Sequence, residues 1–295
     1  MPTFAVYYLS GTLIQRLNKP KYNVMIEVKN ISFKYAGSKH LVFDDFSLKL
    51  EENRIYGLLG KNGTGKSTLL YLLSGLLRPS CGSVCCDGIA TTKREPEMLR
   101  DIFLVTEEFE MPAICLSEYV KLYKPFYPYF SDEVLKDCLA DFELPADVRL
   151  GELSMGQRKK AYIAFAMATN TKYLLMDEPT NGLDIPSKSQ FRKVIAQHMT
   201  EERTVVISTH QVHDVEQMLD HILMLDRHSV LMNASMQDIQ DQYTFEYRTP
   251  QQMDDSVLYA EPTLQGNAVI CRRQEDDAET QVNLELLFNY KTQAK

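Results

Sequence analysis

The sequence predicts an α/β protein with a mixed sheet, an antiparallel β layer, a helical subdomain and a small C-terminal α+β extension. Three observations support this class. Between about residues 25 and 235, short apolar runs typical of buried strands alternate with helical stretches. The first of these runs have no helices between them, which indicates an antiparallel layer. After about residue 235 the strand-like runs are short, are separated by Pro or Gly, and end in one helical stretch.

The individual elements follow from the apolar runs and the residues that flank them. The expected strands of the main part are residues 25–28, 31–35, 46–50, 55–59, 102–105, 173–176, 204–208 and 221–225. No strong strand pattern occurs between residues 112 and 151, so residues 116–123 and 131–142 are expected to be helices. The tail predicts strands at residues 243–248, 256–259 and 268–272, and a closing helix at residues 283–288.

These patterns divide the chain into three parts. Residues 1–24 are expected to be a poorly ordered extension; their apolar run lacks the charged segment that precedes a secretory signal core. Residues 25–235 are expected to form the main domain, with the helical subdomain at about residues 108–152. Residues 236–295 are expected to form an accessory α+β domain.

Composition limits the classes of function. The net charge of -8 gives no basic field for nucleic acid, and the basic run Arg158–Lys160 is expected to be a solvated helix face. Six cysteines without a C-x-x-C pair suit buried thiols in a reducing compartment. The six histidines lack ligand spacing, so no metal site built from protein ligands alone is expected. No apolar run reaches the roughly 18 residues of a membrane span, so we expect a soluble chain or one held at a membrane by another molecule.

The segment between the expected strand 55–59 and the following helix matches G-x-x-x-x-G-K-[ST], a phosphate-binding loop. Glycines let the backbone amides face phosphate oxygens, and the helix N-terminus adds positive potential. The candidate nucleotide-binding residues here are Gly60, Lys61, Asn62, Gly63, Thr64, Gly65, Lys66, Ser67 and Thr68. The alternative is a glycine-rich turn that matches by chance, but the strand and helix around it favour a P-loop NTPase core.

Two carboxylates follow the buried run at residues 173–176. Asp177 is placed to hold Mg²⁺, and Glu178 points to the other side of the chain, where it can polarise a water near a γ-phosphate. The alternative is that Asp177 and Glu178 open an ordinary surface turn. Their position after a hydrophobic strand and downstream of the phosphate loop favours the site.

A further segment, Leu153–Gln157, precedes an expected helix, and its second residue, Ser154, is suited to be the N-cap of that helix. The chain resembles the nucleotide-binding subunit of an ABC transporter over roughly residues 25–235. Leu153–Gln157 resembles the LSGGQ signature of that family, with Met155 in place of a glycine, and Asn181–Asp184 resembles its D-loop. His210 resembles the switch histidine, and Tyr35 the aromatic residue on which adenine stacks. The tail is similar to C-terminal extensions of some bacterial ABC exporter ATPases.

The resemblance implies an ATPase that uses ATP and Mg²⁺. Lys66, Glu178 and His210 are its implied catalytic residues, and Ser67 and Asp177 its implied metal ligands. Glu107 stands where the family has the Q-loop glutamine, and a carboxylate there can still ligate Mg²⁺ while adding negative charge beside ATP. The implied contacts to the ATP of a second subunit are Ser154, Gly156 and Gln157.

The resemblance also implies partners and a location. These are a transmembrane permease, a second ATPase subunit in a head-to-tail ATP sandwich, and no nucleic acid. The chain would lie on the cytoplasmic side, peripheral on the inner face of the membrane, and the tail favours export. The aromatic residues of the helical subdomain either pack that subdomain or line a groove for the permease; they are Tyr119, Tyr123, Phe126, Tyr127, Tyr129 and Phe130.

Two other functions stay open at this point. A soluble ABC-type ATPase acting on ribosomes or DNA is disfavoured, because the chain has neither a second phosphate loop nor sustained heptads. A regulator that binds nucleotide without hydrolysis is disfavoured by the presence of Glu178 and His210. The transported molecule is not encoded in this chain if the permease selects it.

Overall fold

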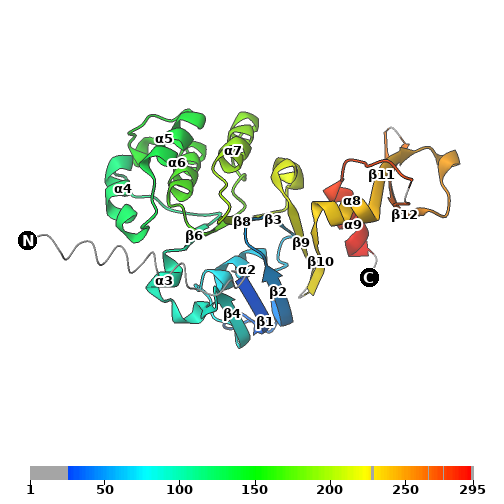
Figure 1. Ribbon diagram of the computed structural model, residues 1–295, viewed down its shortest axis with the longest axis horizontal. Helices are drawn as coiled ribbons and strands as arrows, with labels where there is room; N and C mark the ends of the chain where they lie inside the picture. The colour runs from blue at the N-terminus through cyan, green and yellow to red at the C-terminus, as the bar shows by residue number, and fades with distance from the viewer. Residues whose placement is uncertain (1–25, 227–228, 265, 275, 294–295) are drawn as a thin grey trace, which may run out of the picture.

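The computed structural model describes residues 26–226, 229–264, 266–274 and 276–293 (Figure 1). Within these ranges the chain forms three sheets of six, four and three strands together with helices, which confirms the predicted α/β class. The expected N-terminal extension at residues 1–24 lies outside the described residues. The predicted division of the remaining chain at residue 235 stays a prediction.

The six-stranded sheet is the centre of the molecule. In spatial order its strands are β10 (Ser229–Ser235), β9 (His221–Asp226), β3 (Ile55–Leu59), β8 (Thr204–Thr209), β7 (Tyr173–Asp177) and β6 (Ile102–Val105). Neighbouring strands run parallel except β10, which pairs antiparallel with β9. Every residue of β3, β7 and β8 is buried, as expected of strands covered on both faces. The half-exposed β10 has no such apolar run and was not predicted.

The four-stranded antiparallel sheet forms a separate layer, as predicted. In order its strands are β2 (Phe43–Leu50), β1 (Ile26–Phe33), β4 (Cys81–Cys86) and β5 (Ile89–Ala90). The two strands expected at residues 25–28 and 31–35 are one strand with an irregularity, where Asn30 adopts a φ of 45°. Strand β4 was missed because its first residues are exposed Cys and Gly rather than apolar side chains.

Helices cover both faces of the central sheet (Figure 1). Helix α2 (Lys66–Leu73) packs between the two sheets, where Tyr56 and Leu58 of β3 also point. On the other face, Ile55 and Leu59 of β3 join a second apolar core, as the alternation along a strand requires. The helices there are α4 (Leu116–Tyr123), α5 (Asp132–Asp141), α6 (Met155–Ala168) and α7 (Ile185–Gln197), with the short α3 (Pro96–Leu99) at the sheet edge.

The tail adds a three-stranded sheet and two helices at one end of the molecule (Figure 1). Its elements are α8 (Met236–Gln242), β11 (Tyr243–Arg248), β12 (Val257–Thr263), β13 (Gly266–Arg272) and α9 (Leu284–Gln293). Ile270 of β13 and Leu287 of α9 belong to the same apolar core as Ile222 of β9. Short 3₁₀ turns complete the chain at Thr91–Lys93, Lys124–Phe126, Leu150–Glu152, Val212–Asp214, Glu216–Met218 and Pro250–Gln252.

The cysteines correct one expectation. All six are free thiols, but only Cys86, Cys138 and Cys271 are buried, whereas Cys81 is exposed on β4. Burial raises the pKa of the Cys138 thiol to about 12, so this thiol is packed as a neutral apolar group. Among the described residues, no helix combines the length and apolar character needed to cross a bilayer.

Candidate functional site

The phosphate loop lies between the end of β3 and the first turn of α2. Gly63 and Gly65 have φ values of 81° and 100°, in the left-handed region that favours glycine. A Cβ added to Gly65 would lie 2.8 Å from Val42 Cγ1 and 2.9 Å from Phe43 Cζ, so the loop has no room for a side chain there. Helix α2 has no side-chain N-cap, which leaves its first amides available to an anion.

Lys66 folds back over the loop that it terminates. Its ammonium donates a hydrogen bond of 2.8 Å to the Gly60 carbonyl, and the residue is only 6% exposed. Burial lowers the pKa of Lys66, while the carboxylates of Glu178, Asp177 and Glu107 act in the opposite direction. The cation is therefore held at the loop by neighbouring negative charge.

The structure brings the acid pair to the loop. Asp177 and Glu178 are 1% and 6% exposed at the end of β7, which rules out the ordinary surface turn. The Ser208 hydroxyl on β8 donates a hydrogen bond to the Asp177 carboxylate. Glu178 Oε1 lies 3.8 Å from Lys66 Nζ and 2.9 Å from His210 Nδ1. Since β8 separates β7 from β3 in the sheet, these contacts follow from parallel strands that end at one edge.

Tyr35 and Glu107 lie at the same hollow in the surface. Its lining residues are Tyr35, Val42, Asn62, Gly63, Gly65, Lys66, Ser67, Thr68, Glu107 and Glu178. The Tyr35 hydroxyl lies 3.0 Å from Thr68 Oγ1, and its ring packs edge-on against Phe33 with centroids 5.0 Å apart. The exposed Glu107 carboxylate accepts a 2.8 Å hydrogen bond from the Asn181 side-chain amide. We call the hollow lined by these ten residues the nucleotide hollow.

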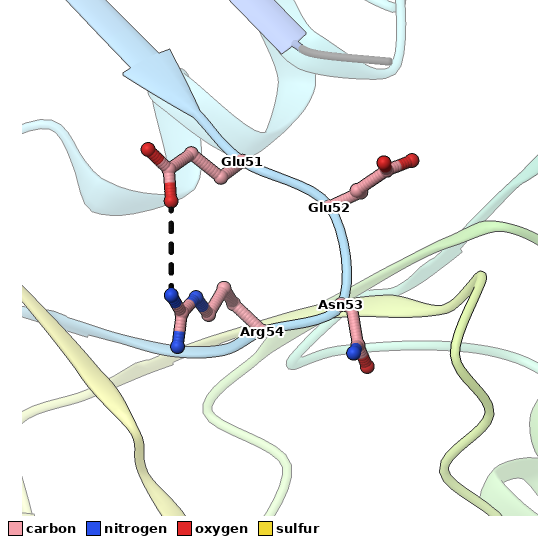
Figure 2. Close-up of a pocket in the computed structure, with 4 residues that line it drawn as sticks. All are labelled: Glu51, Glu52, Asn53 and Arg54. Atoms are coloured by element: carbon pink, nitrogen blue, oxygen red, sulfur yellow. Dashed lines mark ion pairs between the residues drawn. The ribbon is translucent and has the colours of Figure 1, made fainter. Parts of the chain in front are cut away.

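Three predicted residues of the loop, Gly60, Lys61 and Thr64, do not line the hollow. Thr64 is buried, and its hydroxyl donates to the Lys61 carbonyl at 2.9 Å, which closes a tight turn. A second hollow, formed by Glu51–Arg54, contains no predicted site residue (Figure 2). It precedes β3, so it lies at the opposite end of the sheet from the phosphate loop. There Glu51 and Arg54 form an exposed ion pair at 3.9 Å.

The signature segment lies outside the nucleotide hollow. Ser154 caps α6 by accepting a 3.2 Å hydrogen bond from the Gln157 amide, and the Gln157 side chain accepts one from the Ser154 amide at 3.1 Å. Gly156 faces Gly182, whose carbonyl would be 3.5 Å from an added Cβ. Ser154 and Gln157 are exposed, and Gly156 is half-buried. The structure therefore does not bring these three residues to the phosphate loop of their own chain.

Sequence reasoning missed two residues next to the acid pair. Ser208 lies near the end of the apolar strand β8, and only the pairing of β8 with β7 reveals the bond to Asp177. The expectation of a solvated basic face at Arg158–Lys160 is wrong for Lys159, which is 4% exposed. A signal was available, because Lys159 stands four residues before the buried Ile163 and therefore shares its helix face.

A parallel sheet that carries a phosphate loop, with a buried acid pair at a neighbouring strand end, defines a nucleoside triphosphate hydrolase of the P-loop class. The family model described as "ABC transporter" matches residues 43–181. The ABC transporter ATP-binding protein NatA of Bacillus subtilis is 30% identical over 224 residues, covering 73% of this chain and 91% of the relative. The protein YtrB of the same organism is 26% identical over 220 residues, covering 74% and 75%.

A solved structure shows the same fold as this chain. This structure, described as "ATP binding subunit of ABC transporter", superposes with a TM-score of 0.66 at 22% identity, covering 74% of this chain and 92% of that one. This likeness confirms the predicted P-loop fold. The chain belongs to the family of ABC transporter ATP-binding proteins and is an ATP-binding subunit with ATPase activity.

Proposed function

We propose that this chain hydrolyses Mg²⁺-bound ATP between two head-to-tail copies and so drives a separate membrane permease, in the direction of export. The observation that carries the proposal is the contact of Glu178 with both Lys66 and His210 at the phosphate loop. A cation, a buried carboxylate and a histidine converge there within hydrogen-bond or ion-pair distance. Phosphoryl transfer to water needs such charge neutralisation and a positioned nucleophile more than covalent chemistry.

Residues of the nucleotide hollow, together with the adjoining His210, have distinct roles in this proposal. Lys66 and the loop amides meet the phosphate charge, and Tyr35 stacks on adenine at the open side. Glu178 polarises the attacking water, and His210 orients Glu178 and contacts the γ-phosphate. This assignment is supported by the depth of Glu178, which is 6% exposed, and by the 43% exposure of Tyr35 at the rim.

The oxygen atoms beside the loop suit a magnesium ion. Ser67 offers a hydroxyl in the first turn of α2, and Asp177 a buried carboxylate fixed by Ser208. Hydroxyl and carboxylate oxygens together with phosphate oxygens are the ligands that Mg²⁺ prefers, and Glu107 adds a third protein oxygen to the hollow. Bound there, the ion would neutralise charge on the β- and γ-phosphates.

A second copy of the chain, or a paralogue, supplies what one hollow lacks. The N-terminus of α6, with Ser154, Gly156 and Gln157, does not line the hollow of its own chain. Two apolar side chains on this side, Met155 and Ile185, are 78% and 84% exposed, which is unusual for a surface without a partner. We infer that this side meets the nucleotide of the second subunit.

The helical subdomain offers a docking surface for the permease. Of the aromatic residues considered in the sequence, Tyr119 is buried and packs its ring against those of Tyr123 and Phe165, which is a packing role. Other side chains of the subdomain are exposed: Leu122 is 60% exposed and Phe126 is 67% exposed. We propose that the docking surface consists of Leu122, Tyr123, Phe126 and Tyr129. It would hold the chain at the cytoplasmic face of the membrane, and the tail resemblance favours export.

The dimer can be tested with a variant that binds ATP without hydrolysing it. Glu178→Gln removes the negative charge while keeping the shape, so ATP should stay bound and hold two copies together. Light scattering on Glu178→Gln should give twice the monomer mass with ATP and the monomer mass without it. Glu108→Gln, at an exposed acid in the same loop as Glu107, serves as the control and should not accumulate a dimer. A monomeric Glu178→Gln with ATP bound would contradict the head-to-tail arrangement.

A further inference from the structure

Lys159 of α6 is a buried cation that points toward the acid pair rather than toward solvent. Its ammonium donates hydrogen bonds of 3.0 Å to the Glu178 carbonyl and 2.9 Å to the Asn181 carbonyl. The neighbouring Lys160 instead reaches the side chain of Gln190 on α7 at 3.2 Å. Adjacent lysines on one helix therefore have different partners, and only Lys159 contacts the turn that carries Glu178.

That turn has an unfavourable backbone conformation. Glu178 adopts a φ of 45°, in the left-handed region that is unfavourable for a residue with a Cβ. On one side, its amide is held by hydrogen bonds to the Ser208 carbonyl at 3.1 Å and the Ser208 hydroxyl at 3.2 Å. On the other, its carbonyl accepts from Lys159 and from the Asn181 amide, at 3.2 Å for the latter. Lys159 is thus one of three residues, with Ser208 and Asn181, whose hydrogen bonds hold the backbone of Glu178.

The same turn connects Lys159 to the carboxylate that departs from the family pattern. Asn181 accepts from Lys159 through its carbonyl and donates to Glu107 through its side-chain amide. Burial lowers the pKa of Lys159, and the nearby Glu107, Glu178 and Asp177 carboxylates oppose that effect. A second cation near three carboxylates offsets the negative charge that Glu107 adds beside the nucleotide.

We propose that Lys159 is a positioning residue for hydrolysis, which holds the Glu178–Asn181 turn so that the Glu178 carboxylate faces the nucleotide hollow. Because Lys159 lies one turn into α6, it also ties the position of the signature segment to that of Glu178. The inference rests on the proposed role of Glu178. A misplaced carboxylate slows the chemical step while leaving the phosphate loop intact, so its effect falls on kcat rather than on KM.

The test is steady-state ATP hydrolysis by the full chain. Lys159→Gln should lower kcat about tenfold, which corresponds to ~1.4 kcal/mol, with KM for ATP changed less than about twofold. Lys159→Arg keeps a cation with several donors and should recover kcat to within about threefold of the wild type. Lys160→Gln is the matched control and should match the wild type. Thermal unfolding of each variant shows whether the fold is kept.

The outcomes separate this inference from the proposed function. Full kcat in Lys159→Gln beside an inactive Glu178→Gln would overturn the role of Lys159 alone, whereas full activity in Glu178→Gln would overturn the proposed function. A loss in Lys159→Arg equal to that in Lys159→Gln would also overturn the inference, because the cation would then be irrelevant. If Lys159→Gln does not fold, Lys159→Met fills the same space, and the same changes in kcat and KM are expected of it.

Discussion

The nucleotide hollow buries its charged side chains, whereas the C-terminal tail leaves many of its charged side chains exposed to solvent. In the hollow, the side chains of Lys66 and Glu178 are 7% and 8% exposed, and they face each other at 3.8 Å. In the tail, Arg248 pairs at 3.2 Å with Glu246 and at 3.0 Å with Asp254, whose side chains are 38% and 61% exposed. Forming a buried ion pair costs more solvation energy than forming an exposed one. Exposed ion pairs contribute little to the free energy of unfolding.

The difference indicates where charge is needed for chemistry. Buried carboxylates and ammonium groups persist in the hollow although apolar side chains would pack there at lower cost. Such groups cluster where a protein acts on a charged ligand. Substitutions in the hollow should therefore change activity strongly, while those in the tail should change stability weakly.

The largest effect is expected at Glu178. Glu178→Gln should lower kcat for ATP about a thousandfold, because an amide cannot accept the proton of the attacking water. The free energy of unfolding should fall as well, because the neutral amide leaves the buried Lys66 ammonium without one of its opposing charges. Steady-state hydrolysis and thermal unfolding check both parts. Wild-type turnover in Glu178→Gln would contradict the view that the buried charges of the hollow, unlike those of the tail, serve catalysis.

Arg203 tests whether a buried charge away from the hollow affects stability alone. It is 2% exposed and donates to the His198 and Met167 carbonyls at 2.8 and 3.1 Å, and burial lowers its pKa to about 10. Arg203→Met should lower the free energy of unfolding by about 3 kcal/mol, because buried carbonyls lose their donors. Denaturant unfolding measures this, with Arg78→Met at an exposed position as the control. A loss of kcat without a loss of stability would contradict the structural role.

Tyr35 tests the uncharged wall of the hollow. Stacking of a base on an aromatic ring is worth about 1–3 kcal/mol, so Tyr35→Ala should raise KM for ATP about tenfold with kcat almost unchanged. Tyr35→Phe keeps the ring and loses only the contact with Thr68, so it should stay close to the wild type. If the two variants were equally impaired, the hydroxyl rather than the ring would be the important group.

The smallest effect is expected where the tail meets the main part. His213 lies 3.3 Å from Glu216 and 2.9 Å from Glu285 of α9, and hydrogen bonding to Glu216 is the largest cause of its raised pKa. A raised pKa stabilises the folded chain below the unfolded value of about 6.5, and this stabilisation is lost as the pH rises through the folded pKa. Because the side chain is 69% exposed, solvent limits the effect to about 0.5 kcal/mol.

His213→Gln isolates this contribution. The wild type should lose stability relative to His213→Gln between about pH 6 and pH 8, because the glutamine does not titrate. Denaturant unfolding at both pH values, with the two proteins compared side by side, gives the difference. A difference of several kcal/mol would mean that the tail holds buried charge as the hollow does.

Much of the fold was predictable because buried strands are short apolar runs. Strands β3, β6 and β11 and helix α4 have the predicted bounds. Strands β4 and β10 were missed, because half-exposed strands with Ser, Cys or Asn lack the run or alternation that identifies a strand. Helix α7 was also missed, although Asp184 before a proline in the first turn is a recognisable start signal.

The site divides in the same way between local and non-local information. The phosphate loop and the pair Asp177 and Glu178 depend on residues adjacent in sequence, so motifs identify them. Lys159 and Ser208 act through bonds to segments distant along the chain, which only the packing of α6 and β8 against β7 determines. The seam between α9 and the main part, including the contact of His213 with Glu285, was equally invisible to local patterns.

One of the two apolar cores is shared by the tail and the ATPase part, and this limits how the chain can be shortened. Leu284 and Leu287 of α9 are fully buried in the same cluster as Ile222 and Met224 of β9. A fragment that stopped near residue 235 would expose apolar side chains of β9 that share this core with α9. Exposed apolar patches of this kind promote aggregation. Removing the tail would thus destabilise the ATPase part. Transfer of this tail to another ATP-binding subunit would require a complementary apolar surface on that subunit.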